Sequence, residues 1–128
     1  MKQTFLILAI AIGLTSCKQS NNKLLGSWDN KDGQILEFNN DGTALWVFYT
    51  ETDRDTFEIR YTFDHSTTQN QLDLTGFSVG PLTGKTLYGI VEFRGNDTFR
   101  FDCEPSVEDR PKTFSSDQTQ TYYRQQQK

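Results

Sequence analysis

The strongest constraint on the fold is a run of apolar residues that alternate with polar ones. Phe57, Ile59, Tyr61 and Phe63 occupy every second position, and the residues between them are polar or charged. Successive side chains of a β-strand point to opposite faces, so this pattern predicts a strand with one buried face. The rest of the chain shows no sustained apolar stripe with the 3.6-residue period of an amphipathic helix. The sequence therefore predicts an all-β protein.

Two turn signals each join a pair of predicted strands. The first runs from Asn39 to Gly42 and the second from Gly95 to Asp97. Asparagine, aspartate and glycine tolerate the positive φ angles that tight turns require, so each signal predicts a β-hairpin. The paired segments are Gln34–Phe38 with Thr43–Tyr49, and Leu87–Arg94 with Thr98–Cys103.

Three further strands are expected, which gives about eight short strands in total. They are Leu24–Asp29, Gln71–Gly76 and Gln118–Arg124. An all-β chain of this size protects its sheet edges by closing into a barrel or by forming a two-sheet sandwich, and we expect the barrel. The barrel domain is assigned to residues 24–124, with a polar tail at 125–128. Loops held by such a scaffold are candidate functional sites; here they are Thr50–Asp55, Phe77–Lys85 and Glu104–Ser116.

The first residues have the layout of a secretory signal peptide. Lys2 precedes an apolar stretch from Phe5 to Leu14, which is too short to span a bilayer as a permanent helix. Leu14-Thr15-Ser16-Cys17 resembles the bacterial lipobox. That resemblance implies cleavage after residue 16 and thioether lipidation of Cys17, followed by a short polar tether at residues 17–23. An unmodified Cys17 in an ordinary secreted protein is the alternative.

The net charge of the chain disfavours one class of partner. Removing residues 1–16 removes Lys2 and so lowers the formal net charge from −4 to −5. An acidic chain without a basic patch disfavours a nucleic-acid partner.

Acyl chains on Cys17 would hold the domain at a membrane of the bacterial cell envelope. Lys18 is not the acidic residue that favours inner-membrane retention in some bacteria. We expect the outer membrane, and the inner membrane stays an alternative.

Residues Gly26-Ser27-Trp28 on the first predicted strand resemble the Gly-x-Trp signature of lipocalins and related barrels. In those folds the tryptophan closes one end of the barrel beneath an arginine from the last strand. Arg124 matches that arginine by position. The resemblance thus implies a structural role in barrel closure for Gly26, Trp28 and Arg124.

A larger part of the chain resembles the small lipocalin-like domain family of bacteria. The resemblance covers most of residues 24–124 and implies a fold and a location, without an activity. Its weakest part is Thr50–Asn70, where no motif is shared. The segments that carry it are Leu72-Asp73-Leu74-Thr75, Gly84 to Ile90, Asp97 to Cys103, and Arg110-Pro111 with Phe114.

Residues able to support catalysis or metal binding are few. His65 is the single histidine and lies in a polar turn, which favours a solvated side chain over a catalytic one. Cys103 shares the parity of Phe99 and Phe101, so we expect an inert thiol in the core. One histidine and one distant thiol do not make a zinc site, and the carboxylates of Thr50–Asp55 lack the pattern of an EF-hand. The sequence therefore predicts no enzymatic activity, no cofactor and no metal.

Two predicted strands are apolar on both faces, which is unusual for a barrel with a solvated outer surface. Another part of this chain covers the second apolar face, or a bulge breaks the alternation on which this interpretation depends. The remaining alternative is that a partner covers this face. Trp46, Phe48, Lys85 and Tyr88 are accordingly the candidate contacts for a ligand or partner.

We expect a membrane-anchored, non-enzymatic lipocalin-like lipoprotein whose barrel holds a small apolar ligand. An eight-stranded barrel is wide enough either to be filled by side chains or to enclose one small molecule. Its many aromatic residues leave open the alternative of a solid barrel that acts as a protein-interaction or inhibitor module in the envelope, with aromatic anchors at its surface.

Overall fold

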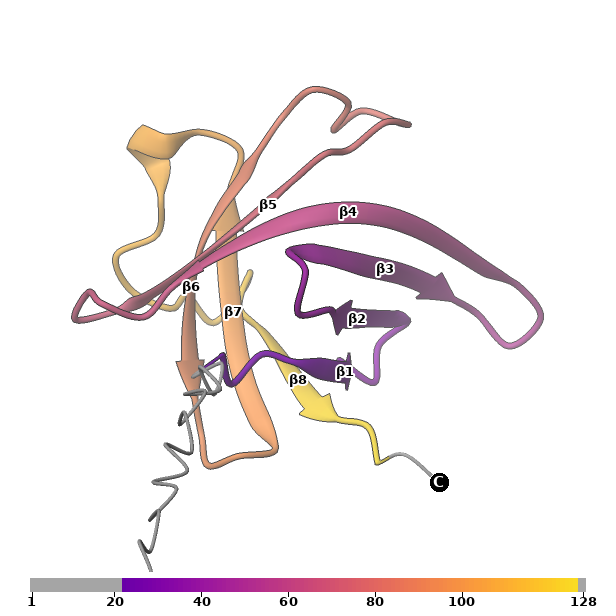
Figure 1. Ribbon diagram of the computed structural model, residues 1–128, viewed down its shortest axis with the longest axis horizontal. Helices are drawn as coiled ribbons and strands as arrows, with labels where there is room; N and C mark the ends of the chain where they lie inside the picture. Colours follow the sequence, from indigo (N-terminus) through magenta and orange to yellow (C-terminus); the bar gives the residue numbers. More distant parts are fainter. Residues whose placement is uncertain (1–21, 127–128) are drawn as a thin grey trace, which may run out of the picture.

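The computed structural model describes residues 22–126 and forms a closed barrel of eight antiparallel strands (Figure 1). Each strand pairs with the next in sequence, and β1 pairs with β8. The predicted all-β class and barrel architecture are confirmed. The elements are β1 (Gly26–Asp29), β2 (Gln34–Phe38), β3 (Thr43–Tyr49), β4 (Arg54–Asp64), β5 (Asn70–Thr75), β6 (Leu87–Phe93), β7 (Thr98–Glu104), the 3₁₀ helix η1 (Val107–Asp109) and β8 (Gln120–Arg124).

Several predictions concern residues outside this range. The signal peptide at 1–16, the lipidation of Cys17, most of the tether and the last two residues of the tail lie outside the described residues. The described end of the tether is fixed in place, because the Asn22 side chain donates a 2.9 Å hydrogen bond to the Tyr61 hydroxyl. At the other terminus, the Gln125 backbone N–H donates to the Ser27 carbonyl at 2.8 Å. No helix within residues 22–126 has the length and apolar content needed to cross a membrane.

Turn chemistry explains where the predicted hairpins reverse. Asp41 accepts hydrogen bonds from the backbone N–H of Thr43 at 3.0 Å and from its hydroxyl at 2.6 Å, and these bonds lower the pKa of Asp41. Gly42 has a φ of 86°, which favours glycine over residues with a side chain. Strands β2 and β3 consequently have the bounds that the sequence predicts.

The barrel has two ends with different closures. At the end where β1 begins and β8 terminates, which we call the closed end, Leu24 and Trp28 are fully buried. The open end carries the loops 76–86 and 105–119. Between the two ends the interior is filled by packed apolar and aromatic side chains. The buried core consists of Leu24, Trp28, Leu36, Phe38, Ala44, Ile59, Leu72, Leu74, Leu87, Val91, Phe99, Phe101 and Tyr122.

Strand β4 is longer than the sequence predicts. Arg54 and Asp55, expected in a charged loop, belong to the strand because they pair with Tyr49 and Phe48 of β3. Strand β5 pairs with β4 only from Arg60 onward. The half of β4 that precedes Arg60 therefore has one edge that pairs with no other strand of residues 22–126, and the barrel wall is incomplete there at its open end.

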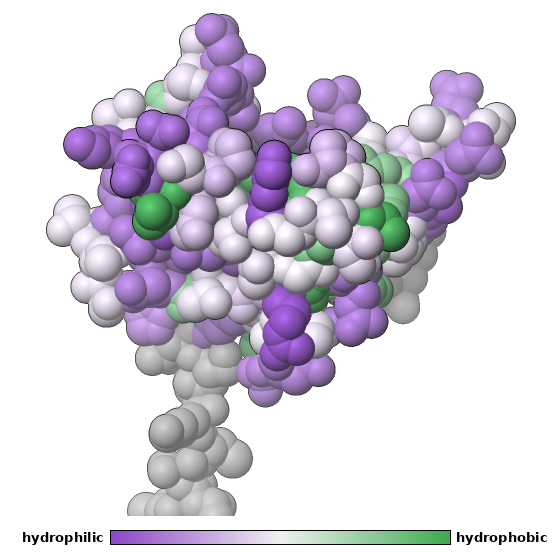
Figure 2. Space-filling model, turned by 90° about the horizontal axis from the view of Figure 1, so that it is seen from above, coloured by the Kyte–Doolittle hydropathy of each residue, from purple (hydrophilic) through white to green (hydrophobic). Residues whose placement is uncertain are grey.

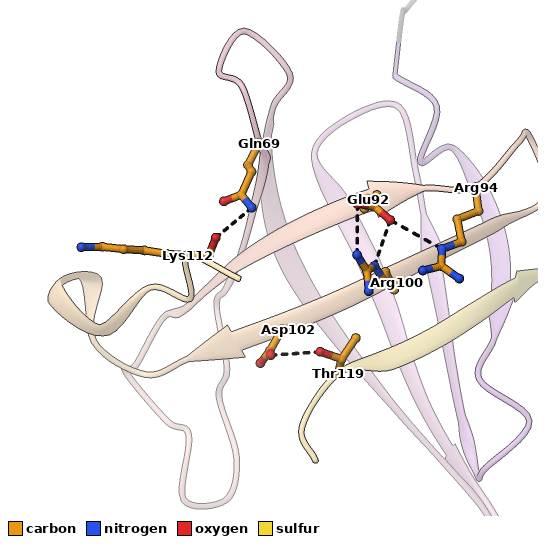
Figure 3. Close-up of polar contacts among 7 residues, drawn as sticks. All are labelled: Gln69, Glu92, Arg94, Arg100, Asp102, Lys112 and Thr119. Carbon is orange, nitrogen blue, oxygen red and sulfur yellow. Dashed lines mark hydrogen bonds and ion pairs between the residues drawn. The ribbon is translucent and has the colours of Figure 1, made fainter. Parts of the chain in front are cut away.

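The long loop 105–119 covers the outer face of β6 and β7. Ile90 and Asp102 face each other across these strands and are only 1% and 3% exposed. Thr119 and Ser115 of the loop donate hydrogen bonds to the Asp102 carboxylate at 3.1 and 3.3 Å, and Figure 3 shows the contact with Thr119. This internal cover explains why β6 is apolar on both faces.

Candidate ligand-binding groove

The closed end is sealed by an arginine stacked on a tryptophan. The guanidinium of Arg124 lies 4.2 Å from the centre of the Trp28 ring, and the Trp28 Nε1–H donates to the Leu24 carbonyl at 2.8 Å. Arg124 also donates to the carbonyls of Leu25 and Asn96 at 2.8 and 3.1 Å. These bonds tie the start of β1 to the β6–β7 turn. These contacts give this end a structural role.

At the open end, an apolar groove of about 620 Å³ lies where the barrel wall is incomplete. Its floor is made by side chains of β3 and β4, and its far wall by the loop segment 77–82. The residues that line it are Trp46, Phe48, Thr56, Phe57, Glu58, Ile59, Phe77, Ser78, Val79, Gly80, Pro81 and Leu82. Seen from above, the surface of the molecule is mostly hydrophilic, and hydrophobic surface is confined to small patches (Figure 2).

Strand register explains why the floor is aromatic. Ala44 and Ile59 are paired core residues, and Trp46 and Phe57 are the next pair on the same face of the strands. Phe48 is two residues further along that face. Trp46 and Phe48 stack with ring centres 5.1 Å apart, and Phe48 meets the Phe57 ring edge-on at 5.8 Å. The groove is thus a continuation of the core face beyond the point where β5 ends.

A polar contact holds the Trp46 ring in place. Its indole N–H donates to the Gln34 side-chain oxygen at 3.1 Å, and the same oxygen accepts from the Tyr122 hydroxyl at 3.2 Å. Burial raises the pKa of Tyr122 further above its ordinary value, and the protonated hydroxyl is the donor in this bond. The loop side of the groove contacts the same ring, because Phe77 lies 5.9 Å from Trp46. Trp46 is therefore fixed from two sides while its remaining surface lines the groove.

The structure separates the four candidate contact residues. Trp46 and Phe48 lie together in the groove. Lys85 is exposed and follows the lining loop without lining the groove itself. Tyr88 lies on the outer face of β6, where the Arg110 guanidinium is 5.4 Å from its ring. Tyr88 is thus part of the contact between the barrel and its covering loop, away from the groove.

Residues missed by the sequence analysis complete the site. In the sequence, Phe57 is one of several apolar residues that alternate along a predicted strand, and nothing there marks it as a site residue. Its place beside Trp46 depends on the β3–β4 register. Phe77 and Leu82 lie in a segment predicted as a loop. Their apolar character in a stretch rich in glycine, proline and serine was the available signal, since an exposed loop seldom needs large apolar side chains.

The residues with catalytic or metal-binding chemistry lie apart from the groove. Burial raises the pKa of the Cys103 thiol to about 12, in agreement with the inert thiol expected. His65 is exposed in the β4–β5 turn and lies 5.9 Å from the Phe63 ring. Within residues 22–126, no group of three or more histidine, cysteine, aspartate or glutamate residues is placed to hold a metal ion.

A second groove of about 470 Å³ lies beside the closed end. It is more polar than the first, and its lining includes Lys23, His65, Gln69 and Glu92 together with aromatic residues such as Phe63. The Gln69 side chain also donates to the Lys112 carbonyl of the covering loop at 2.9 Å (Figure 3). Arg100 engages Glu92 with two hydrogen bonds of 3.0 and 3.1 Å, which lower the pKa of Glu92. The side chains of Gln69 and Glu92 thus already have protein partners.

Comparisons with known proteins leave the family open. No family model, curated protein or solved structure matches this chain. The resemblance to small lipocalin-like domains accordingly stays a prediction from sequence motifs, whereas the barrel is established by its strand pairing.

Proposed function

We propose that this domain binds a small apolar ligand in the open-end groove, as a non-enzymatic lipoprotein of the bacterial cell envelope. The observation that carries the proposal is the groove itself. Its volume of about 620 Å³ lies within the range of about 300 to 1,000 Å³ that small-molecule sites occupy. Its floor of Trp46, Phe48 and Phe57 is apolar, and Phe48 remains 38% exposed.

The ligand belongs at the mouth of the barrel, because the interior is occupied. Trp28, Phe99 and Tyr122 are each at most 1% exposed. The Phe99 ring meets Trp28 edge-on with ring centres 4.6 Å apart and stacks on Tyr122 at 5.1 Å. A ligand seated beneath them would have to displace core side chains, each of which contributes several kcal/mol of stability. Binding at the mouth needs no such displacement.

The proposed anchor determines which way the groove faces. Lys23, at the closed end, is six residues from Cys17, so a lipid on Cys17 would lie within about 20 Å of that end. The groove would then open away from the membrane. Metabolic labelling with an alkynyl fatty acid tests the anchor: it should mark the protein and leave a Cys17→Ala variant unmarked. Equal labelling of both forms would contradict a lipid anchor on Cys17.

A binding experiment tests the groove. A chain from Lys18 to Lys128 keeps all eight strands and every core residue, and a cooperative thermal transition would show that it folds. Calorimetric titration with 1-naphthalenemethanol, a neutral apolar probe, should show one saturable site. Phe48→Ser should weaken binding at least about fivefold, since burial of an aromatic side chain contributes more than about 1 kcal/mol.

The matched control is Tyr123→Ser. Tyr123 is also an aromatic strand residue that is 38% exposed, and it does not line the groove. The control should bind the probe as the unmodified chain does. Equal losses in both variants, or no saturable binding in the unmodified chain, would contradict the proposal.

A second candidate function has one observation in its favour. The unpaired edge of β4 from Arg54 to Ile59 runs beside the groove, and an extended peptide can add to such an edge through main-chain hydrogen bonds. This corresponds to an interaction module of the envelope. To test it, an envelope extract is fractionated over the domain, and a defined peptide that is recovered is resynthesised. Adding this peptide to the domain should slow amide exchange at Arg54–Ile59.

A further inference from the structure

We propose that the ligand of the open-end groove is a small organic cation, with an apolar or aromatic body that fills the groove and an ammonium group held at its rim by carboxylates. This inference rests on the proposed function and adds the chemical class of the ligand. It excludes anionic amphiphiles such as free fatty acids as the preferred occupants.

The first argument is the charge beside the groove. The segment 50–58, which forms the β3–β4 turn and the free half of β4, carries four carboxylates and one guanidinium. None of the four forms an ion pair within the described part of the chain, whose pairs involve other acidic residues. The opposite wall, residues 76–84, has no charged side chain. The four carboxylates are Glu51, Asp53, Asp55 and Glu58.

One of these carboxylates lies on the face of the aromatic floor. Asp55 pairs directly with Phe48 across β3 and β4, and alternation puts it on the same face as Phe57. Glu58 is among the residues that line the groove, and its side chain belongs to the opposite face of β4. An ammonium group at the rim beside Phe48 would therefore lie near the Asp55 carboxylate while its apolar body contacts the rings.

The second argument is the asymmetry of charge along the barrel. Within residues 22–126, the strand ends and loops at the open end carry nine acidic and five basic residues, whereas those at the closed end carry three of each. The acidic excess of these strand ends and loops thus lies at the open end, where the groove is. A cleft lined by one sign of charge raises the local concentration of oppositely charged ligands and disfavours ligands of the same charge.

The third argument is the chemistry of the floor. The faces of aromatic rings carry negative potential, so a cation near Trp46 or Phe48 is attracted to them in addition to the carboxylates. An anion at the same place is repelled by both. Because rings and carboxylates act in the same direction, the groove distinguishes ligands by charge as well as by apolar area.

The test uses three probes with the same naphthyl body and different charges, namely 1-naphthalenemethylamine, 1-naphthalenemethanol and 1-naphthoate. Each is titrated by calorimetry into the folded Lys18–Lys128 chain at neutral pH. We expect the amine to bind about three- to tenfold more tightly than the alcohol, and the carboxylate more weakly than either. Added salt should weaken amine binding and leave alcohol binding unchanged.

Two variants locate the effect. Asp55→Asn combined with Glu58→Gln should abolish the preference for the amine over the alcohol. Glu108→Gln removes an exposed carboxylate from η1, at the same end of the barrel but outside the groove, and should retain the preference.

Each outcome separates this inference from the proposed function. If the alcohol binds at least as tightly as the amine, or if the preference survives in the double variant, the cation inference is overturned and the groove remains a ligand site. If none of the three probes binds, the proposed function fails as well.

Discussion

Arg124 of the last strand lies over Trp28 of the first, with its guanidinium 4.2 Å from the centre of the ring. The two residues are also register partners across the β1–β8 pair that closes the barrel. The side chain of Arg124 donates to backbone carbonyls of Leu25 and Asn96, so one guanidinium connects the seam of the barrel, the segment before β1 and the β6–β7 turn.

Replacing Arg124 by methionine should therefore destabilise the barrel. The variant keeps the apolar stem and loses the cation–π contact and the hydrogen bonds, which predicts a decrease of about 2 kcal/mol in the free energy of unfolding. Urea denaturation followed by tryptophan fluorescence measures this. Arg94→Met, which removes an exposed arginine from the same end, should cost less than about 0.5 kcal/mol. Equal effects of the two substitutions would contradict a closing role for Arg124.

Phe101 should be among the most costly core residues to truncate. It is 4% exposed, and its ring lies so close to Gly89 that a Cβ at that position would be 2.2 Å from the ring. Phe101→Ala should cost about 3 to 5 kcal/mol in denaturation experiments. Phe48→Ala, which removes a 38% exposed ring from the groove floor, should cost less than about 1.5 kcal/mol. A loss below about 1 kcal/mol for Phe101→Ala would show that its ring is not in the core.

The covering loop should depend on Arg110. Its guanidinium donates to both carboxylate oxygens of Asp73 at 2.7 and 3.1 Å and to the Gly89 carbonyl at 2.8 Å. Arg110→Ala leaves a partly buried carboxylate without its partner, so we expect a loss of about 1 to 3 kcal/mol and faster trypsin cleavage after Lys112. Arg110 precedes a proline, so its removal deletes no efficient trypsin site. Unchanged cleavage kinetics would show that the loop is held by other contacts.

Stability should fall as the pH rises above about 9. In the unfolded chain the Cys103 thiol ionises near its ordinary pKa of 9.0, whereas burial keeps it protonated in the barrel up to about 12. The unfolded state therefore binds fewer protons between these values, and its free energy decreases relative to the folded state. Between pH 8 and 10 we expect Cys103 to contribute about 1 kcal/mol to this decrease. A Cys103→Ala variant should show a correspondingly shallower dependence of unfolding free energy on pH, and an identical slope would contradict a buried thiol.

Local patterns in the sequence were sufficient to predict the barrel. Alternation and turn residues identify β2 and β3 to the residue, because short hairpins are specified by neighbouring residues. The predicted start of β4 is wrong. Arg54 and Asp55 have a composition typical of loops, and only their pairing with β3 places them in a strand. Local composition cannot report pairing of that kind.

The groove could be predicted only in part. Trp46 and Phe48 stand out as aromatic residues on a strand that is apolar on both faces. The groove itself results from the difference in length between β4 and β5 and from the loop that carries Phe77, which are properties of register. The sequence places Tyr88 among the candidate contacts for a ligand or partner. In the structure its ring contacts Arg110, which lies in a loop distant in sequence.

The most direct measurement of the central claim is the location of a bound probe. In ¹H–¹⁵N spectra of the folded domain, titration with 1-naphthalenemethanol should shift the amides of residues 46–48, 56–59 and 77–82 and the indole N–H of Trp46. Amides of the closed end around Trp28 and Arg124 should stay in place, because that end is sealed. Shifts confined to the closed-end groove near His65 and Gln69, or scattered over the surface without saturation, would contradict a ligand site at the open end of the barrel.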